Sequence, residues 1–100
     1  MSETSIIRYT TRPDAAEENQ RLVAAVFAEL AQQRPHGLRY AAFRLADGVT
    51  FVHVVQREEG GAELSDLVAF KEFAAGAGER VAVGPAREEA TVVGAYNFPA

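Results

Sequence analysis

The sequence of 100 residues contains no cysteine and no tryptophan. Without cysteine, the chain has no disulfide, no thiolate zinc site, no iron–sulfur cluster and no cysteine nucleophile. No apolar run approaches the roughly 20 residues that a membrane-spanning helix requires. No glycine-rich loop stands between a predicted strand and a predicted helix, so a phosphate-binding loop is excluded as well.

The charge of the chain is modestly acidic: 14 acidic residues against 10 basic ones give a net charge of −4. The basic residues are scattered, so we expect no nucleic-acid partner. The beginning, Met1–Thr4, is polar and is not followed by an apolar run, which predicts no signal peptide. We expect one cytoplasmic domain over residues 1–100, with no membrane partner. The two histidines lie far apart in sequence, so we expect no metal, and no motif calls for a cofactor.

The order of hydrophobic periodicities predicts the fold class. Alternating or β-branched runs predict strands, and apolar residues at helical spacing predict helices. The predicted elements are strand Ile6–Thr10, helix Asp14–Gln33, strands Leu38–Leu45 and Val49–Gln56, helix Leu64–Ala77 and strand Ala90–Phe98. This order is that of an α+β, ferredoxin-like βαββαβ unit, with a four-stranded antiparallel sheet and two helices on one face.

The two central strands predict a hairpin, because Asp47-Gly48 is a strong turn signal between them. A two-residue turn places Arg44 opposite Phe51 and Ala42 opposite His53, whereas a three-residue loop would mix the two faces. We expect the more apolar face to lie under the helices; it comprises Ala41, Phe43, Leu45, Thr50, Val52 and Val54. The face expected to be open comprises Tyr40, Ala42, Arg44, Phe51, His53 and Val55.

The open face predicts self-association. With Tyr40, Phe51 and Val55 uncovered together, it would expose a larger apolar patch than soluble monomers usually do. We therefore expect a homodimer whose interface buries well above ~1,000 Å² of surface.

Several segments carry a resemblance to a known family. They are Gly37-Leu38-Arg39-Tyr40, Phe51-Val52-His53-Val54, Ala69-Phe70-Lys71-Glu72-Phe73, Glu79-Arg80, Val83-Gly84-Pro85 and Val93-Gly94-Ala95-Tyr96-Asn97-Phe98. The pattern resembles the dimeric α+β barrel superfamily, especially antibiotic biosynthesis monooxygenase-like proteins, over nearly the whole chain. The resemblance implies a homodimer with a small-molecule cavity beside each sheet. Haem-degrading relatives resemble one another in an asparagine–tryptophan–histidine set that this tryptophan-free chain lacks, so haem degradation is disfavoured.

His53 is the candidate catalytic residue, because an imidazole within an apolar strand needs a hydrogen-bond partner and transfers protons near neutral pH. A structural histidine bonded to a neighbouring strand or across the dimer is the alternative. The candidate ligand-binding residues are Tyr40, Phe51, Arg44 and Asn97. Each has a structural alternative: strand aromatics for Tyr40 and Phe51, a salt bridge at the dimer rim for Arg44, and an edge-strand amide for Asn97.

Three functions remain open at this stage. The first is binding of a small apolar or aromatic molecule in a cavity beside the sheet. The second is cofactor-independent monooxygenation of a phenol or quinol, in which the substrate anion itself reduces oxygen in a dry pocket. The third is a non-catalytic accessory role beside a pathway enzyme. A cavity favours the first two, whereas a filled interior favours the third.

Overall fold

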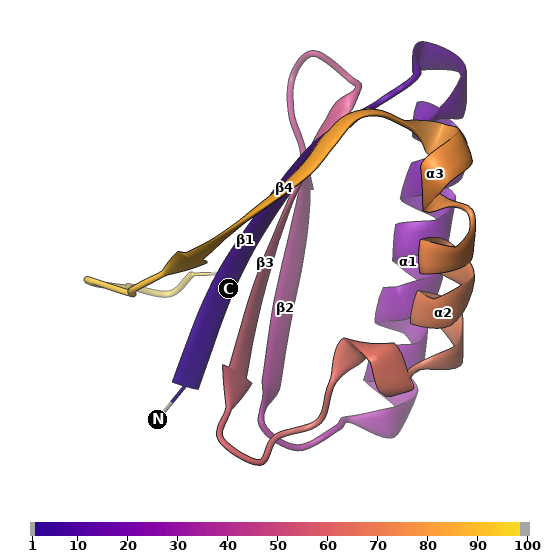
Figure 1. The fold of residues 1–100 in the computed structure, drawn as a ribbon. Coiled ribbons are helices and arrows are strands. Elements are labelled where there is room, and N and C mark those ends of the chain that lie inside the picture. The colour runs from indigo at the N-terminus through magenta and orange to yellow at the C-terminus, as the bar shows by residue number, and fades with distance from the viewer. Residues whose placement is uncertain (1, 99–100) are drawn as a thin grey trace.

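The computed structural model describes residues 2–98 and has four strands. The strands are β1 (Ser2–Thr11), β2 (Leu38–Arg44), β3 (Thr50–Glu58) and β4 (Val81–Ala90). The α-helices are α1 (Ala16–Gln33), α2 (Val68–Ala75) and α3 (Ala77–Arg80), with single 3₁₀ turns at η1 (Pro13–Ala15) and η2 (Leu64–Asp66). The sheet order is β2-β3-β1-β4 and every pairing is antiparallel. All helices cover one face of the sheet (Figure 1), so the predicted ferredoxin-like plan is confirmed.

The hairpin between β2 and β3 has the predicted register. Arg44 pairs with Phe51, and Ala42 pairs with His53. The connection is longer than two residues, because the Leu45 N–H donates to the Thr50 carbonyl and the Gly48 N–H donates to the Leu45 carbonyl. The Asp47 carboxylate accepts from the backbone N–H groups of residues 49 and 50, which holds the turn closed.

The assignment of the two sheet faces is wrong. Phe51 and His53 are 2% and 4% exposed and lie beneath the helices, on the face expected to be open. The polar atoms that favoured an open face are satisfied inside the molecule or at its edge: His53 bonds tyrosine hydroxyls, and Arg44 reaches the Glu17 carboxylate on α1 at 2.9 Å. The face away from the helices carries Ile6, Ala41, Phe43, Val52 and Val54.

The last strand is also misplaced by the sequence pattern. The predicted strand Ala90–Phe98 is not formed; β4 is Val81–Ala90, and residues 91–98 leave the sheet on the side away from the helices (Figure 1). Strand β4 contains Gly84-Pro85 and the charged residues 87–89, a composition more typical of a loop. These residues are tolerated because β4 is an edge strand. Its outer edge pairs with no further strand, so a missing proline N–H costs no hydrogen bond there, and charged side chains can remain in water.

The predicted helices keep their positions but are divided. The predicted start at Asp14 lies in η1, and α1 begins at Ala16. The helix expected over Leu64–Ala77 is interrupted at Leu67, which is extended with ψ 136°, and again at Gly76. None of the helices formed by residues 2–98 is both long and apolar enough to cross a membrane.

The core lies between β1, β3 and the start of α1. Tyr9 stacks on Phe51 with ring centroids 5.6 Å apart, and Ala16 packs against this pair. Val23 and Val26 continue the buried stripe of α1. This cluster fills one end of the layer between sheet and helices and leaves space at the other end.

Candidate functional site

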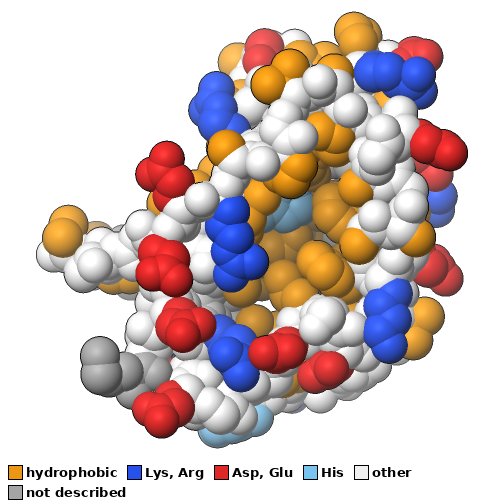
Figure 2. All heavy atoms as spheres, viewed as in Figure 1, with side chains coloured by type: hydrophobic (Ala, Val, Ile, Leu, Met, Phe, Trp, Pro, Cys, Tyr) orange, Lys and Arg blue, Asp and Glu red, His pale blue; other side chains and the backbone are white. Residues whose placement is uncertain are grey.

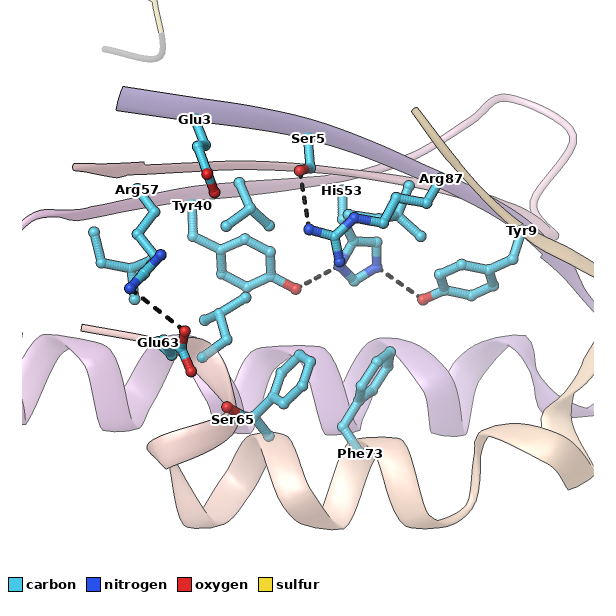
Figure 3. A pocket seen from close by; sticks show the side chains of 15 residues that line it. Glu3, Ser5, Tyr9, Tyr40, His53, Arg57, Glu63, Ser65, Phe73 and Arg87 are labelled. Atoms are coloured by element: carbon cyan, nitrogen blue, oxygen red, sulfur yellow. Dashed lines mark hydrogen bonds and ion pairs between the residues drawn. The ribbon is translucent and has the colours of Figure 1, made fainter. Parts of the chain in front are cut away.

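A cavity of about 400 Å³ opens between the sheet and the α2 side of the helical layer. Figure 2 shows the hollow, with hydrophobic side chains and a histidine inside and charged side chains around its rim. The apolar lining comes from the strands and from α2 and η2: Ile7, Leu38, Val55, Leu64, Phe70 and Phe73. Tyr9, Tyr40 and His53 also line the cavity and lie in a row in Figure 3, with His53 between the two tyrosines. A mostly apolar pocket with a few convergent polar groups is typical of a small-molecule site.

Both ring nitrogens of His53 are engaged by tyrosines. Its Nδ1 is hydrogen-bonded to the Tyr40 hydroxyl, and its Nε2 lies 2.8 Å from the Tyr9 hydroxyl (Figure 3). Tyr9, Tyr40 and His53 come from β1, β2 and β3, and the register places all three on the helix-facing side. Neither ring nitrogen is therefore available to bond a ligand directly, and a tyrosine hydroxyl lies between each nitrogen and the cavity.

The chain of hydrogen bonds continues into the helices. Asn19 Nδ2 donates to the Tyr9 hydroxyl at 2.8 Å, and Arg80 Nε donates to Asn19 Oδ1 at 3.1 Å. Asn19 is wholly buried in α1, and Arg80 is 7% exposed at the end of α3. We call Arg80, Asn19, Tyr9, His53 and Tyr40 the hydrogen-bonded row.

The Arg80 guanidinium is buried with neutral partners. Its Nη2 donates to the Phe73 carbonyl at 2.6 Å, and its Cζ lies 5.1 Å from the centroid of the Phe73 ring. No carboxylate of residues 2–98 forms an ion pair with it. The hydrogen bond from Arg21, and to a smaller extent the charge of Arg80, lower the pKa of Glu18, so a carboxylate lies within electrostatic range of the guanidinium although it makes no direct ion pair with it. A buried cation favours hydrogen-bond acceptors nearby.

Burial sets the protonation of the row. Desolvation lowers the pKa of His53 from 6.5 to about 4, so the imidazole is neutral at pH 7. Burial raises the pKa of Tyr40, and the neighbouring Tyr9 raises it further. Burial also raises the pKa of Tyr9, against the opposing effects of the Asn19 hydrogen bond and the Arg80 charge. The row thus consists of neutral side chains with one cation at its end.

Charged residues stand at the mouth of the cavity. Arg57 pairs with Glu63 at 3.4 Å and donates to the Gly61 carbonyl. Arg87 of β4 donates to the Ser5 hydroxyl at 3.1 Å (Figure 3). Glu3 completes this rim. In residues 2–98, no group of His, Asp and Glu side chains is arranged to hold a metal ion.

The structure brings together two of the five predicted site residues, His53 and Tyr40, in the cavity. Phe51 lies in the core against Tyr9 and does not line the cavity. Arg44 is at the rim of the sheet, bonded to Glu17 and Gln20. Asn97 lies in the exposed segment after β4, outside the cavity lining, with φ 47°.

The sequence interpretation missed Tyr9, Asn19 and Arg80 as site residues. Asn19 carried a usable signal, because it falls at helical spacing within the buried stripe Ala16, Val23 and Val26. An amide in such a stripe requires a buried polar partner. The periodicity gave no such signal for Arg80, because its burial depends on tertiary hydrogen bonds to Asn19 and to the Phe73 carbonyl.

Comparisons with known proteins identify the fold. No family model matches the chain, and no curated protein matches it in sequence. Solved structures do match: Rv0793 from Mycobacterium tuberculosis has a TM-score of 0.74 and 20% identity, covering 95% of this chain and 98% of that one. A Nitrosomonas europaea protein, provisionally described as an antibiotic biosynthesis monooxygenase, has a TM-score of 0.71 and 14% identity, with coverage of 96% and 92%.

A third match is SnoaB from Streptomyces nogalater, a cofactor-independent oxygenase, with a TM-score of 0.67 and 16% identity. The alignment covers 96% of this chain and 97% of SnoaB. The chain therefore has the fold of antibiotic biosynthesis monooxygenase-like proteins, as the resemblance implied. At these identities the likeness establishes the fold alone.

The neutral state of His53 predicts a pH dependence of stability. The folded protein keeps His53 neutral down to about pH 4, whereas the unfolded chain protonates it near pH 6.5. Unfolding therefore takes up a proton within this window, and the free energy of unfolding falls as the pH drops from 6.5 towards 4. Between pH 7 and pH 4.5, we expect the free energy of unfolding to fall by about 2 kcal/mol more in the wild type than in His53→Gln. Urea denaturation at the two pH values measures this difference. Parallel losses in the two proteins would contradict this assignment.

Proposed function

We propose that the protein binds a small apolar or aromatic molecule in the cavity beside His53. The observation that carries this proposal is the cavity itself, about 400 Å³ of space lined by aromatic and aliphatic side chains around a few hydroxyl and imidazole groups. Its volume lies within the range of ligand pockets, roughly 300–1,000 Å³. Phe27 stacks on Tyr40 at 4.8 Å and Phe70 contacts Phe73, so the aromatic walls are held in place before a ligand enters. An open cavity of this kind favours a ligand-binding role over a purely accessory one.

A substitution that fills the cavity tests this proposal. Val55 lines the cavity from β3 and takes no part in the hydrogen-bonded row. Val55→Phe is expected to weaken binding of 1-naphthol at least tenfold, measured by saturation of NMR shifts, because the ring occupies the ligand's space. Val55→Ala leaves the cavity open and serves as the matched control, with affinity within about threefold of the wild type. Unchanged binding to the Val55→Phe variant would place the ligand elsewhere and refute the proposal.

A second candidate function is cofactor-independent oxygenation of a phenol or quinol. It is favoured by the tyrosine hydroxyl in an apolar cavity and by the shared fold with SnoaB, a cofactor-independent oxygenase. A bound phenol would lose its proton to solvent at the mouth, and its anion would transfer an electron to oxygen. The two radicals would combine to form a C–O bond at a ring carbon, and the peroxide anion would take a proton back from solvent. The resulting hydroperoxide would lose water, with the hydrogen of that carbon, to give the quinone. His53, the predicted catalytic residue, would act through Tyr40. Among residues 2–98 the Tyr40 hydroxyl bonds only His53, whereas the Tyr9 hydroxyl bonds both His53 and Asn19.

An oxygen electrode distinguishes the two candidates. With 1-naphthol, oxygenation consumes one molecule of O₂ for each molecule of 1,4-naphthoquinone and water formed. We expect Tyr40→Phe and His53→Ala to lower this rate by roughly tenfold to a hundredfold, since both weaken stabilisation of the phenolate. Saturable binding without oxygen uptake above the rate in buffer would exclude oxygenation and leave ligand binding as the function.

The protein is proposed to act as a homodimer through the face of the sheet away from the helices. The residues expected to form that interface, Tyr40, Phe51 and Val55, face the helices instead. The open face is nevertheless apolar, with Ile6, Phe43, Val52 and Val54 side by side in the register. Exposed Val92, Val93 and Tyr96 follow in the segment on the same side of the sheet. Phe98 stacks on Phe43 with ring centroids 6.0 Å apart, and the rest of this face is half-buried or exposed apolar surface. Apolar surface of this kind is typical of an interaction site.

Sedimentation velocity with two matched valine-to-lysine variants tests the dimer. Val54 lies in the middle of the open face, whereas Val68 is 64% exposed on the helical side. We expect the wild type and Val68→Lys to sediment as dimers at micromolar concentration and Val54→Lys as a monomer, because a lysine buried in an apolar interface loses its hydration. A monomeric wild type would refute the dimer.

A further inference from the structure

The hydrogen-bonded row has a direction that its own chemistry fixes. A guanidinium can only donate, so the atom of Asn19 that faces Arg80 Nε at 3.1 Å must be its oxygen. The amide nitrogen of Asn19 therefore faces Tyr9, and it donates to the Tyr9 hydroxyl at 2.8 Å. The orientation of a buried amide, which is otherwise ambiguous, is set here by a cation.

The proton of the Tyr9 hydroxyl then has one acceptor. Asn19 presents a donor to it, and Tyr9 is 5% exposed, so His53 Nε2 at 2.8 Å is the acceptor within reach among the described residues. A neutral imidazole that accepts at Nε2 carries its proton on Nδ1. His53 Nδ1–H therefore donates to the Tyr40 hydroxyl oxygen.

Tyr40 stands at the end of this sequence with its own proton unused. Among residues 2–98, its hydroxyl has no hydrogen-bond partner besides His53, and it lines the cavity. Every donor in the row points from Arg80 towards Tyr40, so the cation polarises each bond in the same sense and strengthens the last donor. A hydroxyl with an unpaired proton in an apolar cavity favours a ligand acceptor, because that proton gains its hydrogen bond only when such a ligand enters.

We propose that the cavity selects its ligand by an acceptor oxygen, a carbonyl or an oxyanion on an aromatic frame, which receives the Tyr40 proton. Asn19 and Arg80 act as positioning residues that impose this preference from outside the cavity. The proposal rests on the proposed ligand-binding function and specifies the ligand class for that same site. It disfavours ligands whose only polar group at this position is a donor, because such a ligand leaves the Tyr40 proton unpaired.

The tautomer of His53 tests the direction of the row without any ligand. In ¹⁵N NMR spectra at pH 7 we expect a protonated Nδ1 and an unprotonated Nε2 in the wild type. Asn19→Asp is nearly isosteric but presents only acceptors. Its carboxylate accepts from Arg80 and from the Tyr9 hydroxyl, which leaves Tyr9 to accept from His53 Nε2–H. The tautomer should therefore change to Nε2–H, with Tyr40 donating to Nδ1.

A protonated Nε2 in the wild type would overturn the proposal, and so would an unchanged Nδ1–H tautomer in the folded Asn19→Asp variant. If that variant does not fold, the direction of the row is tested by the wild-type tautomer, and the role of Tyr40 by ligand binding to Tyr40→Phe as described next.

A matched pair of probes tests the ligand class. 1-Tetralone and tetralin share one carbon skeleton and differ in the carbonyl oxygen. We expect the wild type to bind the ketone roughly fivefold to tenfold more tightly than tetralin, which is the net contribution of one hydrogen bond. This preference holds although tetralin is the more apolar molecule. Tyr40→Phe and Asn19→Asp should both lose this preference while retaining tetralin binding.

The outcomes separate the two proposals. Tetralin binding as tightly as the ketone in the wild type would overturn the acceptor preference and leave the binding function intact. Failure of both probes to bind at millimolar concentration would overturn the binding function, and the acceptor preference with it.

Discussion

The central constraint on this structure is that a histidine buried in an apolar layer must be neutral and must have both ring nitrogens paired. His53 meets this requirement with a tyrosine on each side, from β1 and β2. Asn19 donates to the Tyr9 hydroxyl, and Arg80 in turn donates to the Asn19 amide oxygen. One polar residue in β3 thus fixes the contacts among three strands, α1 and α3. The cavity lies between these polar side chains of the sheet and the apolar side chains of α2.

The sequence predicted the order of elements and the β2–β3 register because both follow from local periodicity and from the Asp47-Gly48 turn. It could not predict which face of the hairpin lies beneath the helices, because both faces are largely apolar and the polar atoms of one are satisfied only by distant residues. The same limit applies to β4. An edge strand tolerates Pro85 and a run of charged residues that elsewhere indicate a loop.

The candidate site was predictable to the extent that its residues lie in the hairpin. His53 and Tyr40 stood out as polar groups in apolar strands, and the register brought them to one face. Tyr9, Asn19 and Arg80 join them only through tertiary contacts that span 10 to 61 residues. Phe51 and Arg44 were predicted on that same face as site residues. In the structure Phe51 packs in the core and Arg44 lies at the rim of the sheet, so neither lines the cavity. A cavity is the space that packing leaves, and no sequence pattern specifies that space.

The hydrogen-bonded row and the cavity beside it require that His53 be neutral and enclosed by its two tyrosines. An NMR titration of the His53 ring protons measures this state in the intact protein. The structure predicts that these resonances do not move between pH 8 and about pH 5, and that any titration has a pKa near 4. A His53 that titrates near its ordinary pKa of 6.5 would show an imidazole open to water, and would contradict both the row and the site built on it.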